Sequence, residues 1–60
     1  MLHIYASDMV TKLPVFYITE TSNSVIKALK RAKESAKYPV NVQIFNKSNF
    51  KVYDGKVYNG

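Results

Sequence analysis

The segment SNSVIKALKRAKESAK, residues 22–37, decides the fold of this 60-residue chain. It is the only stretch that is long and periodic enough to predict a helix, whereas the residues on either side have the composition of strands. At about 100° per residue, one arc of this helix collects small and apolar side chains, namely Val25, Ala28, Leu29, Ala32 and Ala36. The opposite arc carries charged side chains, namely Lys27, Lys30, Arg31 and Glu34. The pattern predicts a helix that packs its apolar side on a sheet and turns a basic side outward.

The residues around this segment mark its two ends. Residues 20–24 (ETSNS) are rich in side chains that accept hydrogen bonds from the first free N–H groups of a helix, so the start is defined only to within about two residues. At the other end, Lys33 and Lys37 suit the negative pole of the helix dipole. Pro39 forbids continuation of the helix and holds Tyr38 in an extended conformation.

Two strands are predicted before the helix. Residues 2–6 (LHIYA) alternate apolar and polar side chains with the period of a strand, and Ser7-Asp8 is suited to a turn. Residues 13–19 (LPVFYIT) are rich in β-branched and aromatic side chains. Their apolar side chains fall on both faces of the strand, with Phe16 and Ile18 on one face and Val15 and Tyr17 on the other. We therefore expect Val15, Tyr17 and Tyr5 on or near an exposed face, together with the two tyrosines near the C-terminus, Tyr53 and Tyr58.

The residues after the helix predict further strands. Val40, Val42 and Ile44 alternate with amide side chains, as in a strand with one buried face. Residues 46–49 (NKSN) form a turn by composition. Asp54-Gly55 is a strong signal for a two-residue hairpin turn, which would join residues 50–53 to residues 56–58. We expect the final pair, Asn59-Gly60, to fray.

Together these elements predict one small domain over residues 1–60. The order is β-β-α-β-β, and the fold class is α+β, with an antiparallel sheet of four to five strands and one helix packed on one face. Disulfides are excluded because the chain has no Cys, and one His with four scattered acids predicts no metal site and no cofactor. No run approaches the roughly 20 apolar residues that span a bilayer, so we expect no membrane contact and a cytoplasmic protein.

The sequence gives no support to an enzyme. Nucleophilic catalysis needs a nucleophile beside an oriented base, and the only His is His3 on a short strand with no glycine-rich elbow near any serine. The four carboxylates, Asp8, Glu20, Glu34 and Asp54, belong to different elements. We therefore expect a non-enzymatic protein.

Two basic surfaces are candidates for function in a chain whose net charge is +5. The first is the helix face with Lys27, Lys30 and Arg31, which would attract phosphates or an acidic protein surface, or would only keep the domain soluble. The second is the predicted C-terminal hairpin, where Lys51, Tyr53, Lys56 and Tyr58 are expected on one face. Interleaved cations and rings suit single-stranded nucleic acid, protein contact or plain cross-strand packing.

One resemblance concerns the layout of the whole chain. The strand PVFYITE (14–20), the helix SVIKALKRAKESA (24–36) and the strand VNVQIF (40–45), with a bias toward residues that have AT-rich codons and with no Cys, resemble the small host-takeover proteins of lytic bacteriophages. The resemblance implies a protein that binds a host enzyme, toxin or transcription component in the host cytoplasm and blocks it. Many such proteins are acidic DNA mimics, whereas this chain is basic.

The sequence thus predicts a binding module that inhibits or regulates a protein target, through the basic helix face or the Lys/Tyr hairpin. The alternative is a small basic nucleic-acid-binding protein that uses Lys and Arg for phosphates and Tyr for base stacking. A homodimer formed through an edge strand or the uncovered sheet face is compatible with either.

Overall fold

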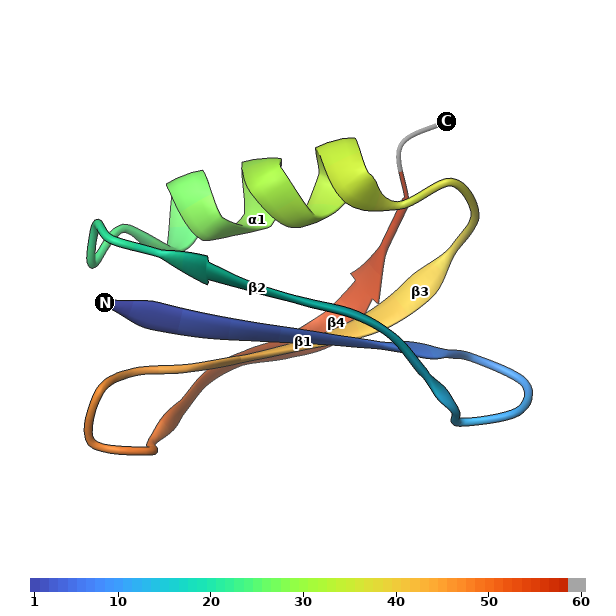
Figure 1. Ribbon diagram of the computed structural model, residues 1–60, viewed down its shortest axis with the longest axis horizontal. Coiled ribbons are helices and arrows are strands. Elements are labelled where there is room, and N and C mark those ends of the chain that lie inside the picture. Colours follow the sequence, from blue (N-terminus) through green and yellow to red (C-terminus); the bar gives the residue numbers. More distant parts are fainter. Residues whose placement is uncertain (59–60) are drawn as a thin grey trace.

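The computed structural model describes residues 1–58, which form one helix and one four-stranded antiparallel sheet (Figure 1). The elements are β1 (Leu2–Asp8), β2 (Pro14–Glu20), α1 (Val25–Ser35), β3 (Val40–Phe45) and β4 (Lys51–Val57). The strands lie in the order β2-β1-β3-β4, and the helix lies along one side of the sheet. This confirms the predicted α+β fold with the order β-β-α-β-β. The expectation for Asn59 and Gly60 lies outside the described residues.

The helix is shorter than the sequence predicts. It begins after Ser24, whose side chain accepts a hydrogen bond from the backbone N–H of Lys27 at 3.3 Å. It ends at Ser35, because Ala36 already has an extended backbone and donates its N–H back to the carbonyls of Ala32 and Lys33. Of the candidate caps at residues 20–24, Ser24 is therefore the one that starts the helix.

The core lies between the helix and one face of the sheet. Its fully buried large side chains are Ile4, Val40, Val42 and Ile44, from the two central strands. Ala28 and Ala32 are also fully buried, and side chains this small let the helix backbone approach the sheet closely. Val25 and Leu29 pack against this core from its margin, so the apolar arc read from the sequence is confirmed.

The turn between β1 and β2 begins later than the predicted Ser7-Asp8. Asp8 is the last residue of β1, and its carboxylate accepts hydrogen bonds from the N–H groups of Val10 and Thr11 at 2.7 and 2.9 Å. Lys12 then adopts a left-handed backbone with φ 66°. The Asp8 carboxylate thus satisfies two backbone N–H groups of this turn, which contains no glycine.

The predicted hairpin at Asp54-Gly55 is wrong. Both residues lie inside β4, where Asp54 pairs with Gln43 and Gly55 pairs with Val42. Gly55 lies under the side chain of Tyr53, two residues earlier on the same face: a Cβ built there would come within 2.8 Å of the Tyr53 hydroxyl. The aromatic ring therefore covers the glycine within an edge strand instead of the glycine opening a turn.

The turn that joins β3 to β4 is the one at residues 46–49, as its composition predicts. The Asn46 side chain accepts hydrogen bonds from the N–H groups of Ser48 and Phe50, at 2.9 and 3.0 Å. Asn49 adopts a left-handed backbone with φ 66°, which asparagine tolerates better than most residues. With the turn here, the seven residues of β4 form one strand that pairs with β3.

Because the sheet has a helix on one side only, its other face is open. Side chains on β1 alternate between the two faces, so Ile4 is fully buried while Tyr5 is 48% exposed. Its cross-strand partner on β2, Tyr17, is 51% exposed. The prediction that Val15, Tyr17 and Tyr5 lie on an exposed face is confirmed. For Tyr53 it is wrong, because this ring packs against the core on the helix side of the sheet.

Candidate binding surfaces

The structure brings four of the seven predicted site residues together in a groove between α1 and β4. Lys30 comes from the helix, Tyr53 and Lys56 come from the strand, and Tyr58 follows the strand. The groove has a volume of about 480 Å³. We call it the basic groove, and its lining residues are Ile26, Leu29, Lys30, Lys33, Tyr53, Lys56, Val57 and Tyr58. The helix face and the C-terminal strand, treated as two candidate surfaces in the sequence, thus form one.

Helical spacing explains how α1 lines this groove. Ile26, Leu29, Lys30 and Lys33 stand at positions i, i+3, i+4 and i+7, which form one stripe on a helix. Leu29 reaches the core at the bottom of the stripe, whereas Ile26 is 80% exposed. A large aliphatic side chain is therefore presented to solvent among cations.

Among the described residues, every ionised side chain that lines the groove is cationic. Lys30, Lys33 and Lys56 line it, and no carboxylate does so among residues 1–58. The two ion pairs within the described part of the chain, Arg31 with Glu20 and Lys51 with Asp54, lie elsewhere. The groove consequently has an apolar floor with a positive rim.

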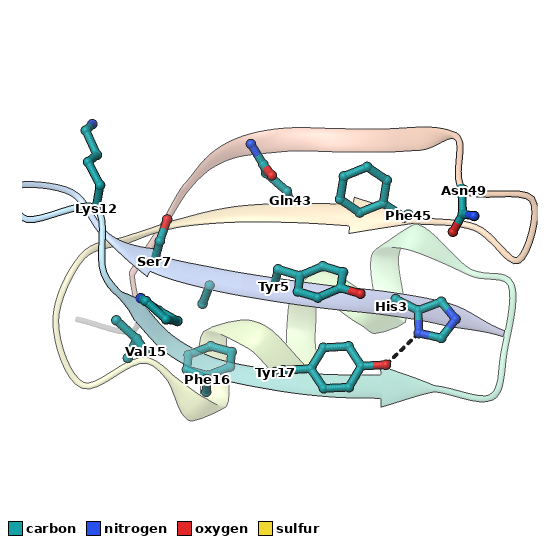
Figure 2. A pocket seen from close by; sticks show the side chains of 12 residues that line it. His3, Tyr5, Ser7, Lys12, Val15, Phe16, Tyr17, Gln43, Phe45 and Asn49 are labelled. Atoms are coloured by element: carbon teal, nitrogen blue, oxygen red, sulfur yellow. Dashed lines mark hydrogen bonds between the residues drawn. The ribbon is translucent and has the colours of Figure 1, made fainter.

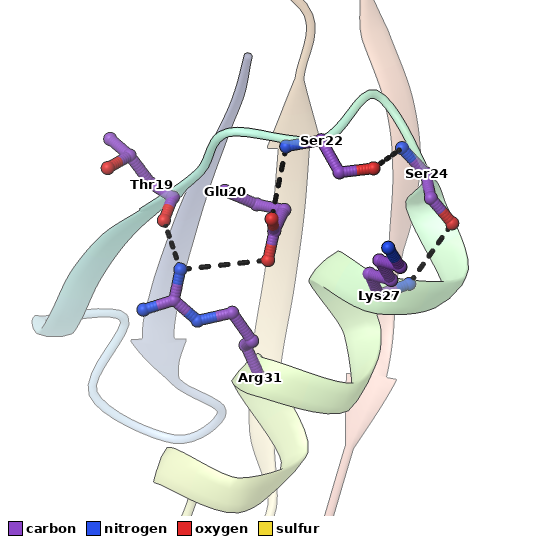
Figure 3. Close-up of polar contacts among 6 residues, drawn as sticks. All are labelled: Thr19, Glu20, Ser22, Ser24, Lys27 and Arg31. Carbon is purple, nitrogen blue, oxygen red and sulfur yellow. Dashed lines mark hydrogen bonds and ion pairs between the residues drawn. The ribbon is translucent and has the colours of Figure 1, made fainter.

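Arg31, although it belongs to the predicted basic face, is occupied by the fold. Its guanidinium donates a hydrogen bond to the Thr19 carbonyl at 2.6 Å and lies 3.6 Å from the Glu20 carboxylate (Figure 3). The backbone N–H of Ser22 and the neighbouring Arg31 hold the pKa of Glu20 below its ordinary value. Arg31 therefore ties the helix to the end of β2. The charge of Lys27 also lowers the pKa of Glu20, and Lys27 is not part of the groove lining.

Lys51 is separated from the groove as well. It pairs with Phe45 across the strands, while Tyr53 pairs with Ile44 on the helix side, so the two residues occupy opposite faces of the sheet. The expectation that Lys51, Tyr53 and Lys56 share a face is therefore wrong, because Lys56 pairs with Asn41 on the open side of the sheet. For Lys56 the cause is the misplaced turn. For Lys51 the cause is an irregularity in the β3–β4 register beside Phe45, which resets the alternation of this strand.

The open face of the sheet carries a second candidate surface, which we call the aromatic face: His3, Tyr5, Tyr17 and Phe45 (Figure 2). These rings come from β1, β2 and β3, and Figure 2 shows them in front of the strands with the helix behind. They form the floor of a shallow hollow of about 660 Å³. Gln43, Asn49, Ser7 and Lys12 contribute polar groups around it.

The rings of the aromatic face are packed against one another. Tyr5 and Tyr17 have ring centroids 4.8 Å apart with planes tilted by 32°. Phe45 stands edge-on to Tyr5, with centroids 5.7 Å apart and an angle of 79°. Such contacts hold each ring in place and contribute about 0.5–1.5 kcal/mol per pair beyond area burial.

His3 and Tyr17 form a flat unit. A hydrogen bond of 2.6 Å joins the His3 Nδ1 to the Tyr17 hydroxyl, and the ring planes differ by 6° with centroids 6.0 Å apart. Each of the two bonded atoms lies in the plane of its own ring, so the planes are offset by no more than about 2.6 Å. That is too little for one ring to sit over the other. The rings therefore lie side by side and make one continuous surface.

Sequence reasoning found only half of the aromatic face. It placed Tyr5 and Tyr17 on an exposed face but left out Phe45, and it treated His3 as an isolated strand residue. The available signal was the alternation of residues 40–45, which puts Phe45 on the face of Gln43. The missing information was the strand order, because β1 lies between β2 and β3 and brings the three strands' rings together.

Further observations bear on what the chain resembles. Among residues 1–58, no helix has the length and apolar character needed to cross a bilayer. The same residues contain no group of three or more His, Asp or Glu side chains that could hold a metal ion. No protein-family model matches the chain, and no similar curated protein or solved structure is found.

Proposed function

We propose that this chain is a non-enzymatic binding module that regulates or inhibits a protein partner through the basic groove. The partner's contact segment is acidic and has one apolar side. The observation that carries the proposal is Ile26, which is 80% exposed in a groove lined by three lysines and, among the described residues, by no carboxylate. Covering a side chain of this size contributes about 1.5–3 kcal/mol, and the lysines select the charge of the segment that covers it.

The shape of the groove favours an extended or helical segment over a folded surface. It runs between one helix and one strand, and apolar side chains lie between its lysines. Segments with apolar residues at positions i, i+3 and i+4 dock in grooves of this kind. The long lysine side chains adjust to the partner's carboxylates, so the charge contacts accelerate association more than they fix one geometry.

The test uses a fluorescein-labelled peptide of Glu and Leu at helical spacing, with a Lys and Leu peptide of the same pattern as the control. We expect the acidic peptide to bind and the basic one to fail. Lys30→Glu/Lys33→Glu should weaken binding about tenfold, because two attractive contacts become repulsive. Ile26→Ala should weaken it about fivefold or more while leaving the far-UV circular dichroism unchanged.

A matched control separates the groove from net charge. Lys37→Glu/Lys47→Glu changes the formal net charge from +5 to +1, as the groove variant does, at two exposed lysines outside the groove lining. Equal losses of peptide affinity in the two variants would contradict the proposal, because the loss would then follow from net charge alone and not from the position of the lysines in the groove.

The resemblance to phage host-takeover proteins stays a prediction, and it indicates which partners to examine first. Affinity capture from a bacterial lysate, with and without nuclease, should recover a protein that the Ile26→Ala variant loses. Recovery that disappears with nuclease would instead favour the nucleic-acid alternative.

A further inference from the structure

We infer that the aromatic face is a stacking platform for the unpaired bases of single-stranded nucleic acid. The inference goes beyond the protein-binding function proposed for the basic groove and does not depend on it, because the two surfaces share no lining residue. It is carried by the flatness, exposure and charge surroundings of four rings on the open side of the sheet.

Flatness is the first argument. The His3–Tyr17 unit is wider than a single ring, and Tyr5 extends it with a tilt of 32°. Phe45 stands edge-on beside Tyr5 and bounds this floor on the β3 side. A base placed on the floor would have a ring beneath it and a second ring at its edge. Nearly parallel rings suit a flat partner, and every base has a π-face to stack on them.

Exposure is the second argument. Tyr5 and Tyr17 are each about half exposed, although they contact their neighbours in the sheet. The opposite face of the same strands is filled by the helix. Ring contacts already hold the platform rigid, so binding requires little further ordering of side chains.

The third argument is the charge around the hollow, which favours one class of ligand over the others. No carboxylate lines the hollow among residues 1–58. Lys12 lies at one end, and Lys51 lies at the other, 6.0 Å from the centroid of the Phe45 ring. Asp54 neutralises part of the Lys51 charge at 3.4 Å, so we expect stacking to contribute more than phosphate contacts. The surroundings suit an anionic strand of flat rings better than a second copy of a +5 chain.

The amides around the hollow fit the same occupant. Gln43 and Asn49 stand beside the rings on the β3 and turn side, and each offers both a donor and an acceptor. Base edges carry both kinds of group, so either amide can serve any base. We therefore expect binding with little sequence preference.

The experiment measures fluorescence anisotropy of a labelled oligo(dT) of about ten nucleotides, at about 0.1 M salt. Tyr5→Leu removes a ring but keeps apolar area, and it should weaken binding about fivefold or more. Tyr5→Phe should remain within about twofold of the unmodified protein, since the ring is retained. The groove variant Lys30→Glu/Lys33→Glu should follow Lys37→Glu/Lys47→Glu, because both change only bulk charge at this surface.

A second readout keeps the test decisive if Tyr5→Leu fails to fold. The chain has no Trp, so Tyr5→Trp introduces one reporter on the platform, and base stacking should quench its fluorescence. A blunt duplex of the same length should bind more weakly and leave the indole fluorescence unquenched, because paired bases cannot lie on the rings.

Several results would overturn the inference. They are equal binding of duplex and single strand, affinity unchanged by Tyr5→Leu, or unquenched fluorescence of the Tyr5→Trp variant at saturating oligonucleotide. Light scattering that shows a dimer broken by Tyr5→Leu would assign the face to a second copy of the chain. Competition of the acidic peptide with oligonucleotide for this face would assign it to a protein. Failure of the unmodified protein to bind the oligonucleotide, with binding of the acidic peptide intact, would reject this inference alone.

Discussion

The basic groove and the aromatic face differ in what makes each a binding surface. In the groove, flexible lysine side chains surround a few aliphatic groups, and the helix and an edge strand supply the two walls. On the aromatic face, rings from three adjacent strands hold one another in fixed positions. The first surface adapts to its ligand and attracts it through charge, whereas the second is preorganised and favours the binding of a flat ligand. A single small domain can therefore present two chemically distinct surfaces.

The difference originates in the alternation of the central strand β1. Ile4 faces the helix and is completely buried, while its neighbour Tyr5 faces the open side. The single helix covers only one face of the sheet. Aliphatic side chains lie on the covered face, and rings with polar tips lie on the other. Stability and recognition are thus assigned to alternate residues of the same strand.

The largest expected effect tests this division. Ile4→Ala should destabilise the domain by about 2–5 kcal/mol, because it leaves a cavity in the core. A domain of this size has only roughly 3–5 kcal/mol of net stability, so the variant should be largely unfolded. Tyr5→Leu should cost about 1–2 kcal/mol, because it removes two ring pairs but keeps apolar area. Urea denaturation followed by circular dichroism measures both, and equal losses would break the division.

The next-largest effect is expected at two neighbouring cationic residues of the helix, Arg31 and Lys30. Arg31→Gln should destabilise the domain by about 1 kcal/mol, because it removes the contacts with Thr19 and Glu20. Lys30→Gln should change stability by less than about 0.5 kcal/mol, as for an exposed side chain without such contacts. In acidic-peptide binding the order should reverse, with Lys30→Gln the more harmful. A larger loss of peptide affinity in Arg31→Gln would place the site on the other side of the helix.

The sequence was sufficient for the fold but not for the surfaces. Periodicity alone identifies the helix and the first three strands, because burial on one side imposes the alternation of residues such as Val40 and Val42. The hairpin at Asp54-Gly55 was mispredicted because local turn preference was outweighed by pairing with β3 and by the packing of Tyr53 on the glycine. The binding surfaces depend on the strand order and on which cationic side chains, such as Arg31, make contacts within the fold. Local spacing in the sequence indicates neither of these.

A smaller effect concerns the floor of the groove. Gly55→Ala should displace the Tyr53 side chain, because a Cβ there would lie 2.8 Å from its hydroxyl. The ring can swing aside, so we expect a stability change below about 1 kcal/mol and roughly twofold weaker binding of the acidic peptide. Oligonucleotide binding should be unaffected, since Tyr53 is not on the aromatic face. Weaker oligonucleotide binding would mean that the two surfaces are coupled.

The smallest effect is the dependence of stability on pH. Hydrogen bonds from the N–H groups of Thr11 and Val10 lower the pKa of Asp8, and the Ser22 N–H and Arg31 lower that of Glu20. A carboxyl group whose pKa is lower in the folded state stabilises the fold above its unfolded pKa of about 4. That stabilisation should disappear as the pH falls below this value. Thermal melts of Asp8→Asn and Glu20→Gln should each show a shallower loss between neutral and acidic pH, and an unchanged acid transition would contradict the assignment.

The measurement that tests the account most directly is a pair of titrations followed by two-dimensional ¹H–¹⁵N NMR, one with the acidic peptide and one with oligo(dT). The account predicts that the peptide shifts the amides of Ile26, Lys30 and Lys56, and that the oligonucleotide shifts those of Tyr5, Tyr17 and Phe45. It also predicts that both ligands bind at once. Perturbation of one common set of residues by both ligands, or displacement of one ligand by the other, would contradict it.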